Sequence, residues 1–198
     1  MQLSFLDTLV SEPPRPASLR PMVFFGIRLA PLALAAAAIV GALARDYRLT
    51  HGLRPAATQH VSLLRVGHGD RLTRDDRQAL CAAAAGVAFA PFDISFDTVM
   101  SFTAHRPAPF PLILSVAEGA APITALARAI ETRAFRHAIR PEGGPPGMPH
   151  MTLLYDPARI PPTPLPAPLA ARIDRFDLIW SHRGQSRYTS LWPDGAEP

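Results

Sequence analysis

Apolar and polar positions follow one another along the chain in an order that predicts the same elements twice. Each round consists of a strand-like apolar run, a helical segment that opens with proline, and a second strand-like run around a histidine: Met22–Leu29, Pro31–Asp46 and His60, then Leu112–Ala117, Pro122–His137 and His150. Proline suits the first helical turn, where its missing N–H would have no partner in any case. The repetition indicates a tandem duplication of one strand–helix–strand unit.

Further elements are predicted between and after the two rounds, namely a helix from Thr73 to about Ala85 and strands at Phe92–Phe102, Ala171–His182 and Ser186–Trp192. Thr73 is a candidate N-cap, because acidic residues follow it in the first turn. The proline-rich segment after Tyr155 is predicted to be a linker, and Arg183–Gln185 a hairpin turn between the last two strands. A closing hairpin favours an antiparallel or mixed sheet over a doubly wound parallel one.

Length and composition fit a soluble globular protein. The chain has 198 residues, of which 48% are hydrophobic and 18% charged, enough for one sizeable domain. We expect an α+β fold with two pseudo-symmetric lobes, each an antiparallel or mixed sheet with helices packed outside, and a cleft between the lobes that holds the functional site. Residues 1–20, with prolines at 13, 14 and 16, are expected to form a flexible extension, and residues 21–193 a single bilobal domain.

Charge and cysteine content limit the class of partner and the compartment. All 20 basic residues are arginine, and the net charge of +4 gives mild support to an anionic partner. The uncharged stretch Leu29–Ala44 is shorter than the roughly 20 residues that span a bilayer, so we expect a core helix there and no membrane association. Cys81 is the single cysteine and is expected to be a buried, inert thiol. Without a recognisable targeting segment, the expected location is the cytoplasm.

Two short motifs carry the candidate chemistry, one from His60 to Leu64 and one from His150 to Leu154. Each is a histidine, one spacer, a hydroxyl residue and two leucines. Because successive side chains of a strand point to opposite faces, each histidine shares its face with the hydroxyl residue two positions later, Ser62 or Thr152. Two such units facing each other would supply one imidazole as base and one as acid, which is enough to cleave a phosphodiester without a metal.

Other interpretations of the motifs stay open at this point. The two histidines could be half-buried residues held by strand packing. A metal site made of His60, His150 and His68 is a third interpretation, but no acidic or cysteine ligand has a supporting spacing. The alternate residues of both motifs are expected to pack on the alanine-rich helices, namely Val61, Leu63, Met151 and Leu153. Surface or loop positions are expected for the other histidines, His51, His105, His137 and His182.

The matched motifs, the strand–helix units before them and the closing strand Ser186–Leu191 resemble the 2H phosphoesterase superfamily over roughly Met22 to Trp192. The branch that looks most similar is the 2′-5′ RNA ligase family, whose members act as RNA 2′,3′-cyclic phosphodiesterases. The resemblance implies metal-independent hydrolysis of RNA 2′,3′-cyclic phosphodiesters to 2′-phosphomonoesters, with reverse 2′-5′ ligation as a minor activity. It implies no cofactor. The implied partners are RNA ends or nucleotides with a 2′,3′-cyclic phosphate, and no obligate protein partner is inferred.

The resemblance also implies roles for the motif residues. His60 and His150 form the catalytic pair, and we assign His60 as the acid that protonates the leaving oxygen and His150 as the base. The sequence alone does not fix this order. Ser62 and Thr152 would donate hydrogen bonds to phosphate oxygens and so stabilise the transition state. No residue is assigned to a metal.

One position departs from the family pattern. Family members often carry an arginine five residues after the second motif histidine, where this chain has Tyr155, while the equivalent position of the first motif is Arg65. Both residues are candidates for substrate binding. In a regular strand they face away from the histidines, so they reach the cleft only through a twist or a bulge. Tyr155 has three interpretations: stacking on a base, donating its hydroxyl, or packing.

Two alternative functions fit the same residues. One is a 2H phosphoesterase that acts on another cyclic nucleotide or nucleotide phosphoester, and the other is an RNA-end or nucleotide-binding module with little turnover. The intact histidine and hydroxyl residues in both motifs favour an enzyme, because binding alone needs no acid–base pair. The loop Gly143–Gly147 lacks the Lys-Ser/Thr ending of a phosphate-binding loop and is expected to shape the entry to His150.

Overall fold

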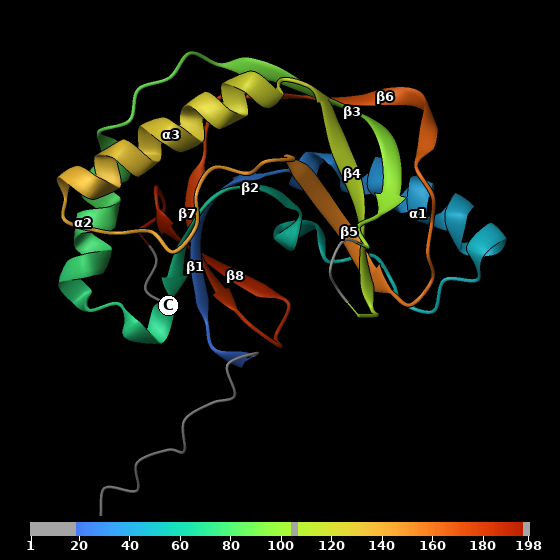
Figure 1. Cartoon of the computed structure of the whole chain (residues 1–198), viewed down its shortest axis with the longest axis horizontal. Helices are drawn as coiled ribbons and strands as arrows, with labels where there is room; N and C mark the ends of the chain where they lie inside the picture. Colours follow the sequence, from blue (N-terminus) through green and yellow to red (C-terminus); the bar gives the residue numbers. More distant parts are fainter. Residues whose placement is uncertain (1–18, 104–106, 196–198) are drawn as a thin grey trace, which may run out of the picture.

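The computed structural model describes residues 19–103 and 107–195 (Figure 1). Most of the expected N-terminal extension, residues 1–18, lies outside the described residues. The strands are β1 (Met22–Arg28), β2 (His60–His68), β3 (Phe92–Ser101), β4 (Phe110–Glu118), β5 (His150–Asp156), β6 (Thr163–Ile173), β7 (Asp177–His182) and β8 (Arg187–Trp192). The α-helices are α1 (Ala33–Tyr47), α2 (Arg74–Ala85) and α3 (Ala120–Arg136), and 3-10 turns lie at Ala30–Leu32, Ala56–Thr58 and Gly69–Arg71.

Within the described residues, the strands form one eight-stranded antiparallel sheet in the order β6-β3-β4-β5-β2-β1-β7-β8. We call β2, β1, β7 and β8 the first lobe, and β5, β4, β3 and β6 the second lobe. The lobes meet where β2 and β5 pair, and that junction consists of a single residue pair, Val61 with Met151. The expected α+β fold with two pseudo-symmetric lobes is confirmed, and the pairing is antiparallel throughout.

The two helices of the duplicated unit are α1 and α3. Each of them packs on one lobe, while the strand that precedes it belongs to the other lobe. The helix α3 follows β4 of the second lobe but packs on β2 of the first lobe and against α2. Figure 1 shows α1, which follows β1, at the end of the molecule occupied by β3 to β6. The helices therefore link the lobes as well as covering them.

The core faces of the two motif strands are closed to solvent, as the alternation predicts. Val61 and Met151 are fully buried, as are Leu63 and Leu153, and all four belong to one continuous apolar cluster. At roughly 1.5 to 3 kcal/mol for each fully buried aliphatic side chain, this packing contributes strongly to holding the motif strands in place. The opposite faces of the same strands are thereby left to line a cavity.

The helix α1 is less buried than the expected core helix. It packs along one stripe formed by Ala36, Val40 and Leu43, while Leu34 on the outer side is 87% exposed. By length and composition alone, the segment Ala30–Tyr47 would pass as a membrane span, and 22% of it is buried within the protein. Its alanine-rich outer side explains this, because small apolar residues raise the mean hydropathy without needing a packing partner.

The end of the chain differs from the prediction. The proline-rich segment expected as a linker forms the edge strand β6, and the strand expected at Ala171–His182 is divided between β6 and β7. Three prolines in β6 are spaced two residues apart, at 164, 166 and 168, so all of them lack an N–H on the same side of the strand. An edge strand tolerates this, because one of its sides has no pairing partner.

Two smaller predictions concern α2. Thr73 caps the helix as predicted, since its hydroxyl accepts a hydrogen bond from the Asp76 backbone while the Asp76 carboxylate accepts one from the Thr73 backbone. Cys81 is half-buried instead of buried, and its thiol donates a weak hydrogen bond to the carbonyl oxygen of Leu191 at 3.6 Å.

Candidate active site

Both motif strands contain a β-bulge at the same place. The pairing of β1 with β2 skips Leu63, and the pairing of β4 with β5 skips Leu153. The extra residue lets both leucines of each motif turn into the core, and it rotates the following residue back to the histidine face. Arg65 and Tyr155 therefore lie on the same side of their strands as the histidines. A twist or bulge was the condition predicted for these two residues to reach the cleft.

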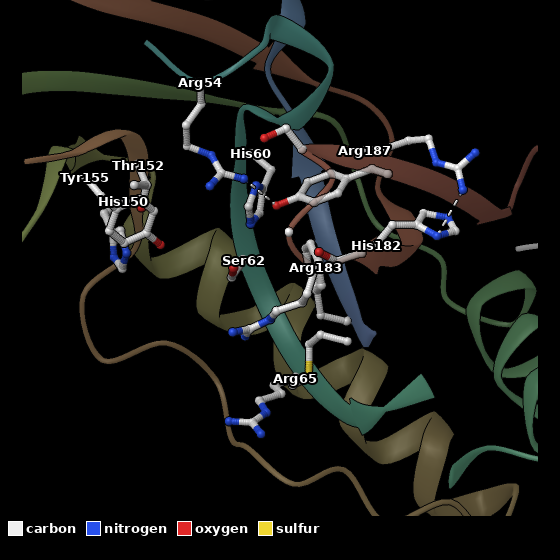
Figure 2. Close-up of a pocket in the computed structure, with 16 residues that line it drawn as sticks. Arg54, His60, Ser62, Arg65, His150, Thr152, Tyr155, His182, Arg183 and Arg187 are labelled. Atoms are coloured by element: carbon white, nitrogen blue, oxygen red, sulfur yellow. Dashed lines mark hydrogen bonds between the residues drawn. The ribbon is translucent and has the colours of Figure 1, made fainter. Parts of the chain in front are cut away.

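The two histidine faces line one cavity of about 520 Å³ between the lobes (Figure 2). All six residues singled out from the sequence line it: His60, Ser62 and Arg65 from β2 and His150, Thr152 and Tyr155 from β5. The β7–β8 hairpin forms a further wall with Ser181, His182, Arg183, Gly184, Ser186, Arg187 and Tyr188. A volume of this size is in the usual range for small-ligand sites.

The two imidazoles are anchored in the same way. Nδ1 of His60 lies 2.9 Å from the carbonyl oxygen of Thr58, and Nδ1 of His150 lies 2.8 Å from that of Met148. A carbonyl oxygen only accepts hydrogen bonds, so Nδ1 carries the proton in both rings. In the neutral form, Nε2 of each ring then holds a lone pair that is available to a ligand in the cavity.

The surroundings of the two histidines differ. The His60 ring packs against Phe24, with centroids 4.8 Å apart, and lies edge-on to Tyr188 at 5.4 Å. Burial lowers the pKa of His60 to about 4, the hydrogen bond to Thr58 opposes this, and the charges of Arg54 and His150 lower it further. His60 is therefore neutral at neutral pH. The His150 ring instead stacks on Phe102, with centroids 5.8 Å apart.

The cavity is strongly positive. Among its described lining residues there is no aspartate or glutamate, whereas four are arginines: Arg54, Arg65, Arg183 and Arg187. The Arg65 guanidinium lies 2.9 Å from the carboxylate of Glu142 at the rim, so its charge is partly compensated. A cavity lined by one sign of charge attracts ligands of the opposite sign, which makes an anion the expected occupant.

Several lining residues were not found from the sequence. His182, expected on the surface or in a loop, lies in the cavity wall, where its Nε2 is 2.8 Å from the Thr189 hydroxyl. Arg54 comes from the loop before β2 and carries no motif, so no signal pointed to it. Tyr188 also lines the cavity and lies within the closing strand Ser186–Leu191, which is part of the family resemblance. That strand is the sequence signal that could have indicated Tyr188 as a site residue.

The metal interpretation requires several ligating side chains close together. Within residues 19–103 and 107–195, no three histidine, cysteine, aspartate or glutamate side chains form a cluster suited to a metal ion. His68 ends β2 and is not among the described residues that line the cavity.

The loop Gly143–Gly147 runs beside β2, with the backbone N–H of Gly143 donating a hydrogen bond to the Arg65 carbonyl oxygen.

The chain matches the family model of the 2′-5′ RNA ligase superfamily over residues 31–185, which is most of its length. The chain belongs to this superfamily. Its members are 2H phosphoesterases and ligases, so the family assignment supports an enzyme and agrees with the resemblance seen in the motifs.

Solved structures of this superfamily have the same fold. Escherichia coli LigT in its apo form superposes with a TM-score of 0.63 at 21% identity, and LigT complexed with ATP with 0.62 at 20%, each match covering 87% of this chain and 95% of that chain. The protein TT0787 of Thermus thermophilus gives 0.62 at 22% identity, covering 86% of this chain and 94% of that chain. No match was found among curated proteins.

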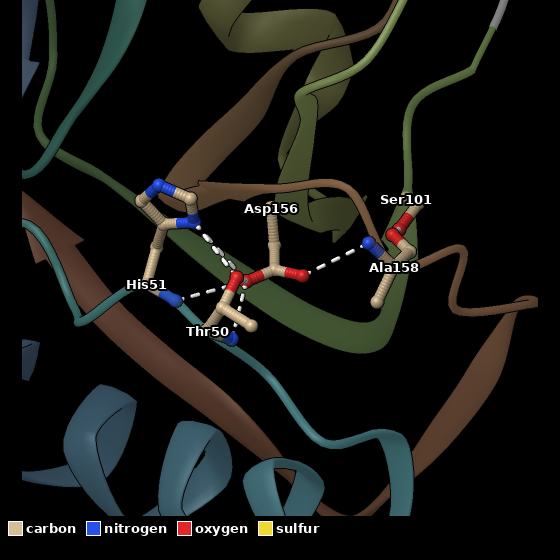
Figure 3. Close-up of polar contacts among 5 residues, drawn as sticks. All are labelled: Thr50, His51, Ser101, Asp156 and Ala158. Carbon is tan, nitrogen blue, oxygen red and sulfur yellow. Dashed lines mark hydrogen bonds and ion pairs between the residues drawn. The ribbon is translucent and has the colours of Figure 1, made fainter.

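A buried carboxylate fastens the loop that leads from α1 to the cavity. Asp156, at the end of β5, accepts hydrogen bonds from the backbone and hydroxyl of Thr50 at 2.7 and 3.0 Å, from the His51 backbone at 2.9 Å and from the Ala158 backbone at 2.9 Å (Figure 3). Nearer the site, the backbone N–H of Arg54 donates to the Leu153 carbonyl oxygen at 2.8 Å. The loop is thus tied to the second motif strand.

This cluster makes stability depend on acid pH. Burial alone would raise the pKa of Asp156, but the hydrogen bonds from Ala158, Thr50 and His51 outweigh it and lower the pKa from 3.8 to about 2. The carboxylate therefore stabilises the fold above about pH 4, and this contribution is lost as the pH falls through about 2. We expect Asp156→Asn to lower the free energy of unfolding at pH 7 by about 2 kcal/mol, measured by urea denaturation.

The exposed Asp75→Asn is the matched control, with an expected change of about 0.5 kcal/mol or less. The Asp156 variant should also lose most of the stability change between about pH 4 and pH 2. Equal stability of the two variants at neutral pH would contradict the role given to Asp156.

Proposed function

We propose that this chain hydrolyses RNA 2′,3′-cyclic phosphodiesters to 2′-phosphomonoesters with His60 and His150 as an acid–base pair. The observation that carries the proposal is the matched anchoring of the two rings: each Nδ1 is held by a backbone carbonyl, and both rings line one positive cavity. The family assignment supports the reaction class, a phosphoester transformation.

The reaction needs two proton transfers. A base removes a proton from water, whose oxygen attacks phosphorus, and the bond from phosphorus to the ribose O3′ breaks. An acid donates a proton to O3′, which leaves as a hydroxyl, and the phosphate stays on O2′. The hydroxyls of Ser62 and Thr152 would donate to the non-bridging oxygens, where negative charge grows in the transition state. Both transfers are served by side chains, so the proposal requires no metal.

A neutral His60 is suited to the role of the base, which leaves the role of the acid to His150. A base must be neutral before it acts, and burial keeps the pKa of His60 at about 4, so that its Nε2 holds a lone pair at neutral pH. This order reverses the one assigned from the sequence. The reversal rests on the neighbours of His60, namely Phe24, Tyr188 and Arg54, which the two equal motifs do not reveal.

A nucleotide is the ligand class that best fits the cavity. The arginines continue beyond the histidines to the β7–β8 hairpin, which suits a polyanion longer than a single phosphate. The similar protein LigT has been crystallised with NADP+ and with 3′-AMP as well as with ATP. RNA ends are accordingly proposed as the natural substrates. As a minor activity we propose 2′-5′ ligation, in which the 5′-hydroxyl of a second RNA end attacks the cyclic phosphate in place of water and O3′ leaves as a hydroxyl. Action in the cytoplasm, without an obligate protein partner, stays a prediction, as does the single domain over residues 21–193.

The test is incubation of the purified protein with a nucleoside 2′,3′-cyclic phosphate in the presence of a chelator, followed by chromatography that separates 2′- from 3′-monophosphates. We expect the 2′-monophosphate. No turnover of this substrate but turnover of a 3′,5′-cyclic nucleotide would favour the alternative phosphoesterase. Tight binding of RNA ends without any turnover would favour a binding module. Turnover that stops with chelator and returns with added metal would overturn the metal-free chemistry.

A further inference from the structure

Arg54 reaches into the cavity from the loop between α1 and β2 and contacts both lobes. Figure 2 shows its side chain extending towards His60. Its Nη2 donates a hydrogen bond to the Tyr188 hydroxyl of β8 at 3.0 Å. Its guanidinium carbon lies 5.9 Å from the ring centroid of Tyr155 on β5. Arg54 therefore occupies the space between the two motif strands, where a bound phosphate would lie.

The charge of Arg54 is not compensated within the described part of the chain. No carboxylate there lies within ion-pair distance of it, and its Nε is buried without a hydrogen-bond partner. Leaving a buried guanidinium N–H unpaired costs free energy, so buried charges are normally paired. Arg65, by contrast, has Glu142 as a partner. Arg54 is thus a half-buried cation that no described carboxylate pairs with, in a cavity whose described lining residues include no acid, and this arrangement suits an anionic ligand.

Tyr188 adds a second donor at the same place. Because its oxygen accepts the hydrogen bond from Arg54, the hydroxyl proton of Tyr188 remains available to another acceptor. Burial raises the pKa of Tyr188, while the charge of Arg54 opposes this, so the phenol keeps its proton at neutral pH. The ring is fixed edge-on against Phe24, with centroids 5.6 Å apart, as well as against His60.

The backbone around Arg54 holds it in position before any ligand arrives. Its N–H donates to the Leu153 carbonyl oxygen, and its own carbonyl oxygen accepts from Nε2 of Gln59 at 3.2 Å. The Asp156 cluster fastens the preceding residues, Thr50 and His51. A side chain on an anchored backbone loses less entropy when it binds, which makes preorganised donors effective.

We propose that Arg54 and Tyr188 form an anion clamp that binds the phosphoryl group of the substrate, with Arg54 as a substrate-binding residue that no motif reveals. The clamp supplies from the loop the guanidinium that is absent at position 155. This inference rests on the proposed function for the identity of the substrate. The anion binding itself does not depend on turnover.

The test uses inorganic phosphate as the probe and the shift of the melting temperature as the readout. Phosphate should raise the melting temperature of the wild type, because it binds the folded state only. In Arg54→Met we expect phosphate affinity to fall by about tenfold to 100-fold, the usual range for charge-assisted hydrogen bonds. Arg54→Lys, which keeps the charge without the fork, should lie between, and Tyr188→Phe should weaken binding by about tenfold or less.

The matched control is Arg172→Met on the edge strand β6, where Arg172 is 60% exposed and pairs with Asp93. It should keep the full response to phosphate. A merely structural Arg54 would lower the melting temperature of the methionine variant without phosphate and leave phosphate affinity unchanged, which would overturn the clamp. If Arg54→Met does not fold, the phosphate affinities of Arg54→Lys and Tyr188→Phe provide the test. Wild-type phosphate affinity in both variants would overturn the clamp.

The outcomes for the clamp and for the reaction can be separated. Loss of phosphate binding in the Arg54 variants of a protein that turns over no cyclic phosphate would support the clamp and reject the proposed reaction. Normal phosphate binding in the same variants, with turnover intact, would reject the clamp and leave the reaction standing. The double variant Arg54→Met/Tyr188→Phe should lose less than the two single effects combined, because the side chains act as a unit.

Discussion

Replacing His60 or His150 with alanine is expected to slow hydrolysis of a nucleoside 2′,3′-cyclic phosphate by about 100-fold to 10,000-fold. This is the usual contribution of a general acid or base, and each variant removes one of the two proton transfers. Both rings line the cavity, on the strand faces opposite to the buried Val61 and Met151, so the fold should be retained. The measurements are kcat and kcat/KM, with thermal unfolding followed by circular dichroism as the check on folding.

His137→Ala, an exposed histidine at the end of α3, is the matched control and should turn over like the wild type. Full activity in both His60→Ala and His150→Ala would contradict the acid–base pair. Loss of activity together with loss of the folding transition would instead describe a structural histidine.

A change of leaving group then separates the acid from the base. A p-nitrophenyl phosphodiester releases p-nitrophenolate, which leaves without needing a proton, so the acid becomes dispensable while the base does not. With His60 as base, His150→Ala should regain most of the wild-type rate on this substrate and His60→Ala should not. The opposite result would restore the order assigned from the sequence.

Removing the motif hydroxyls is the second change with a large expected effect. Thr152→Val and Ser62→Ala should each lower kcat by about 100-fold to 1,000-fold, the cost typical of losing one donor to a developing negative charge. KM should change much less, because the interaction strengthens mainly in the transition state. Steady-state kinetics on the cyclic phosphate measure both quantities.

Valine has the shape of threonine without the hydroxyl, so Thr152→Val isolates the donor. The matched control is Thr163→Val on β6, where the hydroxyl donates to the Pro161 carbonyl oxygen away from the cavity. This variant should have the kcat and KM of the wild type. A rise in KM with unchanged kcat in the Thr152 variant would mean that the hydroxyl binds the substrate equally well in the ground state and in the transition state.

The duplicated architecture and the six motif residues could be predicted because the sequence repeats its own pattern. Periodicity placed the histidines and hydroxyls on one face, and the pairing of β2 with β5 at Val61 and Met151 is what brings those faces together. The bulge itself was not predicted, except as the condition for Arg65 and Tyr155 to reach the cleft. Two adjacent leucines cannot both face the core of a regular strand, and the bulge is what allows Leu63 and Leu64 to do so.

Other features were out of reach for physical reasons. The strand β6 was missed because prolines argue against a strand unless it lies at an edge, and edge position is decided by the tertiary pairing with β3. Arg54 was missed because its position comes from contacts with Leu153, Tyr188 and Gln59, which are far from it or carry no local pattern. The different surroundings of the two histidines likewise arise from tertiary contacts, Phe24 and Tyr188 beside His60 and Phe102 beside His150.

Each helix of the duplicated unit covers the lobe opposite to the strand it follows, so one repeat alone could not cover its own sheet. The apolar side of β2, with Val61 and Leu63, is covered by α3, and α3 follows a strand of the other lobe. A lone copy of the repeated unit would leave that surface open to water. Two copies cover both lobes at once, so the present chain has the construction of a symmetric dimer whose subunits have been fused, with the cavity on the former axis between them.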